Sequence, residues 1–208
     1  MKIKVCGMRD PLNINEVVAL EPDYLGFIFY RKSARFVDVT KLEEFLPQLP
    51  SSIKRVGVFV DELVDEVIAI SKKLGLSHVQ LHGHESPEYC TQVQEANLSV
   101  IKVFHMDDTF EVSQTESYLN CSDLFLFDTK TNGYGGSGKH FDWSVLQDYT
   151  ANKPFLLSGG VSVEDIKKIK SLEIPQLLGI DVNSRVEVSP GIKDIEKVNE
   201  LILKTREG

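Results

Sequence analysis

The sequence predicts an α/β protein, a (β/α)8 TIM barrel that forms a single domain over residues 1–208. Eight short runs rich in Val, Ile, Leu and Phe recur along the chain. Eight segments with helical spacing alternate with these runs, at a period of roughly 25 residues that is typical of a βα repeat. Closing eight such units on themselves gives a barrel, and a doubly wound open sheet is the alternative.

The apolar runs are mostly too short for helices and have the composition of buried strands. They occupy residues 3–6, 24–29, 55–60, 78–82, 99–104, 124–128, 154–158 and 177–182. The chain shows no linker or low-complexity tract between them, which favours one domain.

The helical segments cover residues 12–20, 39–46, 61–74, 86 onward, 108–119, 143–149, 162–170 and 193–204. Two of these segments carry start signals. Ser86 precedes Pro87, which fits an N-cap followed by proline in the first turn. Ser162 precedes apolar residues at helical spacing and is a second expected N-cap.

Composition narrows the class of function. The chain is 42% hydrophobic and 26% charged, which is ordinary for a globular protein, and its net charge is −8. This charge argues against nucleic acid as a partner, but a few local donors still allow an anionic small-molecule substrate.

Cysteine usage and the first residues indicate the compartment. Three cysteines without a Cys-x-x-Cys motif favour a reducing environment over a disulfide scaffold. The start MKIKVCGMRD lacks an apolar signal-peptide region, and no run reaches the length of a membrane span. We therefore expect a cytoplasmic protein without a membrane partner.

Polar residues follow most of the predicted strands, at the end where barrel enzymes carry their chemistry. They are Cys6-Gly7, Arg31 to Arg35, Gln80 to Gly83, Asp128 to Lys130, Ser158 to Gly160, and Asp181 to Ser184. We expect the side chains of His82 and Asp181 to form polar walls of a site at this rim.

Cys6 and Asp128 are the candidates for acid–base chemistry. Cys6 is either a small buried hydrophobe or a thiolate base or nucleophile, and the second role needs a lowered pKa. Asp128 ends the apolar run Leu-Phe-Leu-Phe. It either caps the following loop or acts as an acid or base whose pKa is raised by its apolar neighbours.

Two loops are candidates for binding phosphate. Gly159 and Gly160 stand between a strand and a capped helix, where backbone N–H groups approach an anion, although a plain tight turn is the alternative. The loop with Asn183 and Ser184 follows the last strand, and the barrel phosphate site is built from these two loops.

The histidines do not predict a metal. His78 and His82 lie about 13 Å apart along a strand and cannot share an ion. His82 and His84 could share one, but a third ligand is not evident. We expect no metal, with His78 structural.

The stretch GYGGSGKH at 133–140 is close to a nucleotide-binding P-loop. However, His140 stands where that motif needs a hydroxyl, and four residues separate Gly133 from the strand end at Asp128. A loop that covers the barrel mouth fits better, with Gly135, Gly136, Ser137 and Gly138 over the site.

Several stretches together resemble the phosphoribosylanthranilate isomerase family. They are KVCGMRD at 4–10, GFIFYRKSARFV at 26–37, RVGVFVDE at 55–62, VQLHGHES at 79–86, FDTKTNGYGGSGKHFDWS at 127–144, LLSGGV at 156–161 and GIDVNSRVEVSPGIKD at 179–194. They span nearly the whole chain in the family's order, which makes the combination specific.

The resemblance implies a barrel enzyme of tryptophan biosynthesis that performs an Amadori rearrangement without cofactor or metal. Its substrate is phosphoribosylanthranilate. The resemblance assigns Cys6 as general base, Asp128 as general acid and Arg35 as the partner of the anthranilate carboxylate. It also places the phosphate at Gly159-Gly160 and Asn183-Ser184. The sequence leaves open whether the protein is a monomer or homodimer.

The chain departs from the family pattern in its last loop, where Asn183 and Arg185 replace small residues. Three other functions fit these residues less well. An indole-glycerol-phosphate synthase needs a catalytic lysine at the end of a strand, whereas Lys4 and Lys102 lie within predicted strands. A sugar-phosphate binder has no use for both Cys6 and Asp128, and a cysteine hydrolase lacks an oxyanion device.

Overall fold

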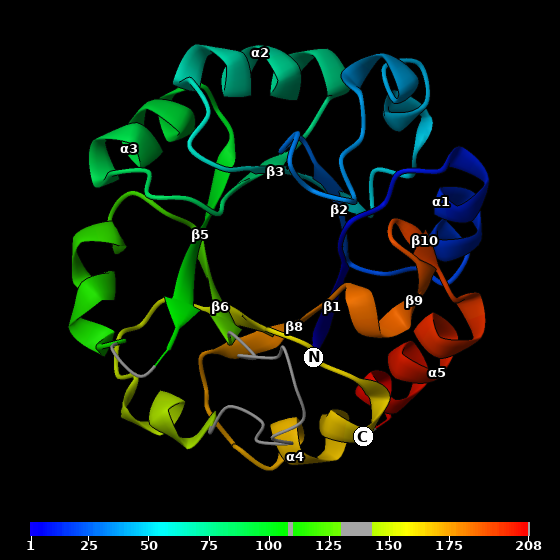
Figure 1. Cartoon of the computed structure of the whole chain (residues 1–208). Coiled ribbons are helices and arrows are strands. Elements are labelled where there is room, and N and C mark those ends of the chain that lie inside the picture. The colour runs from blue at the N-terminus through cyan, green and yellow to red at the C-terminus, as the bar shows by residue number, and fades with distance from the viewer. Residues whose placement is uncertain (108–109, 130–142, 208) are drawn as a thin grey trace.

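The computed structural model describes residues 1–107, 110–129 and 143–207, and it is a closed barrel of eight parallel strands in sequential order (Figure 1). The strands are β1 (Lys2–Val5), β2 (Tyr24–Ile28), β3 (Lys54–Phe59), β4 (His78–Leu81), β5 (Ser99–Met106), β6 (Leu124–Thr129), β7 (Phe155–Ser158) and β8 (Leu177–Val182). The predicted barrel and all eight strands are confirmed, and the open sheet is excluded because β8 pairs with β1.

Helices and short 3-10 turns surround the strands (Figure 1). The α-helices are α1 (Pro11–Val18), α2 (Val64–Leu74), α3 (Pro87–Glu95), α4 (Ile166–Lys170) and α5 (Ile195–Arg206). The 3-10 turns are η1 (Val39–Lys41), η2 (Leu46–Gln48), η3 (Val112–Tyr118), η4 (Trp143–Asp148), η5 (Val163–Asp165) and η6 (Ser184–Val186). Ser86 caps α3 as expected, since its side chain accepts from the Tyr89 amide.

Three predicted helices are 3-10 turns instead, and one of them is the segment 143–149, which forms η4. The segment 39–46 gives η1 and the start of η2, where Asp38 caps η1 and Pro47 lies in η2. The described part of 108–119 forms η3, where the Thr115 hydroxyl donates to the Val112 carbonyl. Local bonds of this kind compete with the i−4 pattern of an α-helix.

A small hairpin is the element that the sequence pattern missed. Strand β9 (Glu187–Ser189) pairs antiparallel with β10 (Ile192–Lys193), so Lys193 belongs to a strand and the last helix begins at Ile195. The turn contains Pro190 and Gly191, a dipeptide that marks turns. The hairpin lies beside α1 and α5 on the outside of the barrel (Figure 1).

Two buried clusters follow from strand alternation. Residues two apart on a strand point to the same face, so each strand sends one set inward and the other toward the helices. The interior cluster is Val56, Ile101, Val103, Leu124, Leu126 and Leu156. The larger cluster packs the strands against the helices, and in it Phe127 contacts Tyr149 and Phe155 edge-on.

Lys102 is one of the strand residues whose side chains point outward, toward the helices. Its Nζ lies 2.8 Å from Glu85 Oε2 and 2.8 Å from the Gly83 carbonyl, and both charged side chains are almost fully buried. Because this lysine faces away from the barrel interior, it is not available as a catalytic lysine at the mouth.

This ion pair predicts a stability difference. We expect Glu85→Ala to lower the free energy of unfolding by about 3–5 kcal/mol, because it leaves the Lys102 ammonium buried without its partner. Glu43→Ala is the matched control, since its pair with Lys73 is about half exposed and contributes at most about 1 kcal/mol. Urea unfolding followed by circular dichroism measures both. Equal losses in the two variants would contradict the argument.

Candidate active site

A pocket of about 200 Å3 opens at the carboxyl end of the strands. It is lined by Cys6, Ile28, Val58, Gln80, His82, Asp128, Ser158, Gly159, Gly160, Asp181, Asn183 and Ser184. Eight of the residues expected at the site therefore meet here, contributed by strands and loops far apart in the sequence. The volume is below the range of typical small-molecule pockets, so a larger ligand extends from it over the rim.

Two groups of expected residues are not part of this lining. Gly135, Gly136, Ser137 and Gly138 lie outside the described residues. Arg35 stands at the rim beside Gly7 rather than in the pocket wall: a side-chain carbon at Gly7 would meet its Cδ at 2.8 Å.

Cys6 follows β1 directly and is 4% exposed. Burial raises the pKa of its thiol above the usual value, and the nearby Lys4 ammonium opposes this effect. Gly26 on the neighbouring strand makes room for the sulfur, because a side-chain carbon there would stand 2.7 Å from Sγ. The thiol is thus held in place, but its ionisation depends on the adjacent cation.

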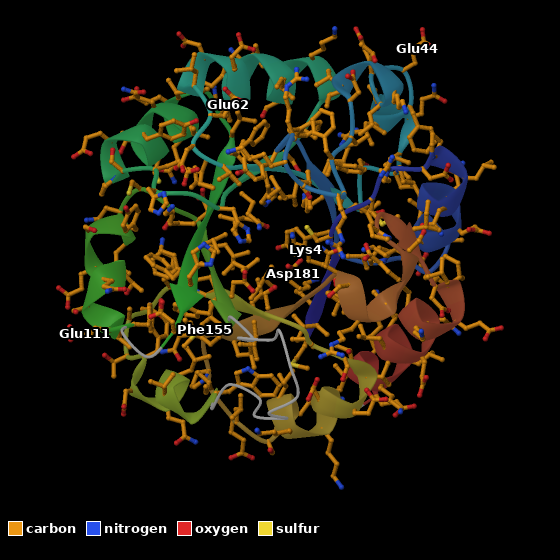
Figure 2. All side chains as sticks on the ribbon, in the orientation of Figure 1. Lys4, Glu44, Glu62, Glu111, Phe155 and Asp181 are labelled. Atoms are coloured by element: carbon orange, nitrogen blue, oxygen red, sulfur yellow. The ribbon has the colours of Figure 1, made fainter. Side chains whose placement is uncertain are left out.

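That cation belongs to a buried polar network inside the barrel. Lys4 Nζ donates to Asp181 Oδ1 over 2.7 Å, and the Ser158 hydroxyl donates to Asp181 Oδ2 over 3.0 Å. Figure 2 shows Lys4 and Asp181 side by side near the centre of the barrel. Both oxygens of Asp181 therefore have partners within the protein. Asp181 lines the pocket, and its carboxylate holds the Lys4 ammonium in position.

The pKa of Asp128 on β6 departs from one of the two alternatives that the sequence left open, an acid or base with a raised pKa. Burial raises its pKa, but the hydrogen bond from His82 and the charges of His82 and His105 outweigh burial, so the pKa lies below its usual value. The distances from Asp128 Oδ2 are 3.3 Å to His82 Nε2 and 3.8 Å to His105 Nδ1. The expectation of a raised pKa was wrong because two imidazoles from neighbouring strands face the carboxylate.

The orientation of His82 follows from its second contact. Its Nδ1 lies 2.9 Å from the amide nitrogen of Gln80. Its Nε2 lies 3.3 Å from Asp128 Oδ2, so both ring nitrogens have a polar partner. Gln80 therefore holds the ring in place, and His82 in turn fixes the position of the Asp128 carboxylate.

The two expected phosphate loops have different local structures. Gly159 and Gly160 have φ of 98° and 80°, a left-handed backbone that favours glycine. The elements that follow are the single turn η5 and the five-residue α4, so the expected helix is short. Within η5, the Asp165 carboxylate accepts from the backbone and hydroxyl of Ser162.

The loop after β8 is held by a lysine and a glutamate. Asn183 Oδ1 accepts from Lys193 Nζ at 2.8 Å, and the same ammonium lies 2.7 Å from Glu187 Oε1. The Glu187 carboxylate also accepts hydrogen bonds from Nε and Nη2 of Arg35, and Nη2 lies 2.7 Å from Oε2. Arg35 is thus oriented by an internal carboxylate before any ligand arrives.

Two other histidines of the described residues, His78 and His84, lie outside the pocket lining. His78 is at the opposite end of β4, where its ring packs edge-on against Tyr24 and burial lowers its pKa to about 4. His84 is 94% exposed and pairs with Asp61. The structural interpretation of His78 is consistent with these contacts.

Sequence reasoning missed several residues of the site. They are Lys4, Gln80, Ser158 as a partner of Asp181, His105 and Glu187. Strand alternation provides a signal for three of them, since Lys4, Gln80 and His105 each stand two positions from an inward-facing residue. His105 also lies in register with Asp128 on the adjacent strand.

The fold and the position of these polar groups at the strand ends define the class, a (β/α)8 barrel enzyme that acts on a small molecule. The family model for N-(5'phosphoribosyl)anthranilate (PRA) isomerase matches residues 3–204. The chain belongs to the N-(5'-phosphoribosyl)anthranilate isomerase family. It is an isomerase of tryptophan biosynthesis, as the sequence resemblance implied.

Individual relatives agree with this assignment. The N-(5'-phosphoribosyl)anthranilate isomerase of Parabacteroides distasonis is 45% identical over 203 residues, which are 97% of this chain and 92% of the relative. The crystal structure of phosphoribosyl anthranilate isomerase from Thermotoga maritima gives a TM-score of 0.88 at 32% identity and covers 99% of this chain and 98% of its own. A further structure of such an isomerase, in complex with reduced 1-(o-carboxyphenylamino)-1-deoxyribulose 5-phosphate, gives 0.86 at 28%, with coverage of 99% and 98%.

The Lys4 network predicts a change in thiol ionisation. We expect Lys4→Met to raise the pKa of Cys6, because it removes the cation that opposes burial. Alkylation by iodoacetamide, followed against pH in a Cys90→Ser, Cys121→Ser background, should then begin at higher pH. Lys102→Met is the control, since it removes another buried ion-paired lysine on a different strand and should leave the profile unchanged. Identical profiles for the Lys4 variant and its parent would contradict the coupling.

Proposed function

We propose that Cys6 and Asp128 are the general base and general acid that convert N-(5-phosphoribosyl)anthranilate to 1-(2-carboxyphenylamino)-1-deoxyribulose 5-phosphate. The single observation that carries this proposal is that both side chains line one pocket at the barrel mouth, from β1 and β6. One acid and one base in different environments suffice for this internal redox isomerisation.

The first step opens the ribose ring. The ring oxygen takes a proton from the Asp128 carboxyl group, and the C1′–O bond breaks to leave a Schiff base at C1′ and Asp128 as a carboxylate. Because His82 and His105 favour the carboxylate form in the ligand-free protein, we propose that Asp128 takes up a proton as the substrate binds and donates it to the ring oxygen.

The second step moves the double bond. The Schiff base acidifies the proton at C2′, and the Cys6 thiolate removes it to give an enolamine, which tautomerises to the ketone. C1′ is reduced and C2′ is oxidised within one molecule, so the reaction balances without an external oxidant or reductant. The buried Lys4 ammonium stabilises the thiolate that this step requires.

Binding of the substrate uses its two anionic ends. We propose that the phosphate binds at Gly159-Gly160 and Asn183-Ser184, which line the pocket, and that the anthranilate carboxylate binds Arg35 at the rim. In the ligand-free protein, Glu187 pairs with both Arg35 and Lys193. When the Arg35 guanidinium turns toward the substrate, Lys193 still neutralises the Glu187 carboxylate. The small pocket volume agrees with a ligand that reaches from the phosphate loops to the rim.

The setting of the reaction is also a proposal. None of the helices in the described residues has the length and apolar character needed to cross a lipid bilayer. Together with three free cysteines, this supports a cytoplasmic enzyme. We propose a monomer or homodimer, since a related isomerase from Thermotoga maritima is described as dimeric and as convertible to monomers.

The acid–base roles predict severe losses of turnover. The wild-type protein should consume phosphoribosylanthranilate in a fluorescence assay, whereas Cys6→Ser and Asp128→Asn should each lower kcat by about 10²–10⁴-fold. Cys90→Ser is the matched control, because this cysteine lies in α3 away from the pocket. Near-wild-type turnover in a folded Cys6 or Asp128 variant would refute that assignment, and an inactive wild-type protein would refute the function.

The role of Arg35 predicts a change in KM. We expect Arg35→Ala to raise KM by roughly ten- to a hundredfold, because it removes a charge-assisted hydrogen bond to the substrate carboxylate. Arg31→Ala is the control, since Arg31 lies over the ring of Phe36 outside the pocket. An unchanged KM for the Arg35 variant would remove its proposed role.

A further inference from the structure

Three metal-ligating side chains meet at the ends of three consecutive strands. His82 follows β4, His105 is in β5 and Asp128 is in β6, and one ligand atom from each lies within 4.8 Å of the others. The arrangement is set by the barrel, because His105 and Asp128 are register partners on adjacent strands and share the same face. The sequence argument against a metal lacked a third ligand, and His105 with Asp128 completes the set around His82.

Two of the three distances between the ligand atoms are close to the spacing around a tetrahedral ion. Bonds of about 2.0–2.1 Å to zinc place neighbouring ligand atoms about 3.3 Å apart. His82 Nε2 lies 3.3 Å from Asp128 Oδ2, and His105 Nδ1 lies 3.8 Å from the same oxygen. The ligand atoms of His82 and His105 lie within 4.8 Å of each other.

The donor set also selects the class of ion. Two imidazoles and one carboxylate suit borderline transition metals, whereas magnesium and calcium prefer oxygen ligands. All three side chains are between a quarter and two fifths exposed, which leaves the ion a path from solvent.

We propose that His82, His105 and Asp128 form a binding site for a divalent transition-metal ion, zinc above all, and that occupation of this site inhibits the enzyme. The inhibition rests on the proposed function of Asp128. A bound ion takes the Asp128 carboxylate oxygen and the Nε2 atom of His82, so Asp128 no longer gives a proton to the ribose ring oxygen. The fourth position of the ion faces water or the substrate.

Binding is tested directly on the full-length protein after treatment with chelator. Titration with Co2+ should give the visible absorption of a tetrahedral site, and Zn2+ should abolish that absorption by competition. His82→Gln, His105→Gln and Asp128→Asn should each weaken Zn2+ binding by at least about tenfold. Circular dichroism establishes that each variant is folded.

Two controls separate this site from other metal ligands. His84→Gln alters the exposed pair with Asp61, which has only two donors, and should leave Zn2+ affinity unchanged. Cys6→Ser removes the thiol of the same pocket and should also retain the Co2+ spectrum. Loss of binding in the Cys6 variant, or full affinity in folded His105→Gln, would overturn the proposed site.

Inhibition is measured separately with the fluorescence assay. Zn2+ should inhibit the wild-type protein over the concentration range in which it binds, and His105→Gln should require at least about tenfold more Zn2+ for the same fractional inhibition. Each variant is compared with its own activity in chelator. Because binding is read without turnover, an inactive wild-type protein refutes the proposed function, whereas absence of Co2+ and Zn2+ binding refutes the site.

Discussion

The ion pair between Lys4 and Asp181 lies across the seam where β8 meets β1 and the barrel closes. The two residues are register partners, and both are buried with Ser158 as the third member. A buried charge without its partner is strongly unfavourable, so Lys4 and Asp181 require each other, and closure of the barrel brings them together. The same pair fixes an ammonium beside Cys6, so the constraint that closes the fold also prepares the thiol.

Opposite charges are distributed unevenly over the mouth of the barrel. The protein is acidic, with a net charge of −8, yet the groups around the pocket include Lys4, Lys193 and Arg35, each paired with a carboxylate. Across the mouth, Asp128 is held by His82 and His105. Local pairing of this kind lets an acidic chain receive an anionic ligand, because the cations are concentrated where the ligand binds.

The fold was predictable because buried strands have a recognisable apolar composition in the sequence. Strands covered on both sides are continuous apolar runs, and all eight were found within a few residues of their observed ends. The three segments that form 3-10 turns were predicted as α-helices, and local side-chain bonds such as Thr115 to Val112 oppose that conformation. The β9–β10 hairpin was missed, since its conformation depends on the Pro190-Gly191 turn. The position of the site was equally predictable, because polar residues after the strands meet at one rim.

The sequence by itself determined the alternation of strands and helices, the rim that carries the polar residues, and the residues Cys6 and Asp128 as partners in one pocket. It did so because these features depend on local periodicity and on the fixed geometry of parallel strands. Only the tertiary structure decided the charge states. Asp128 became an ionised carboxylate between two imidazoles, and Cys6 a buried thiol beside Lys4. A pKa depends on the distances to groups from other strands, and those distances exist only after the barrel has closed.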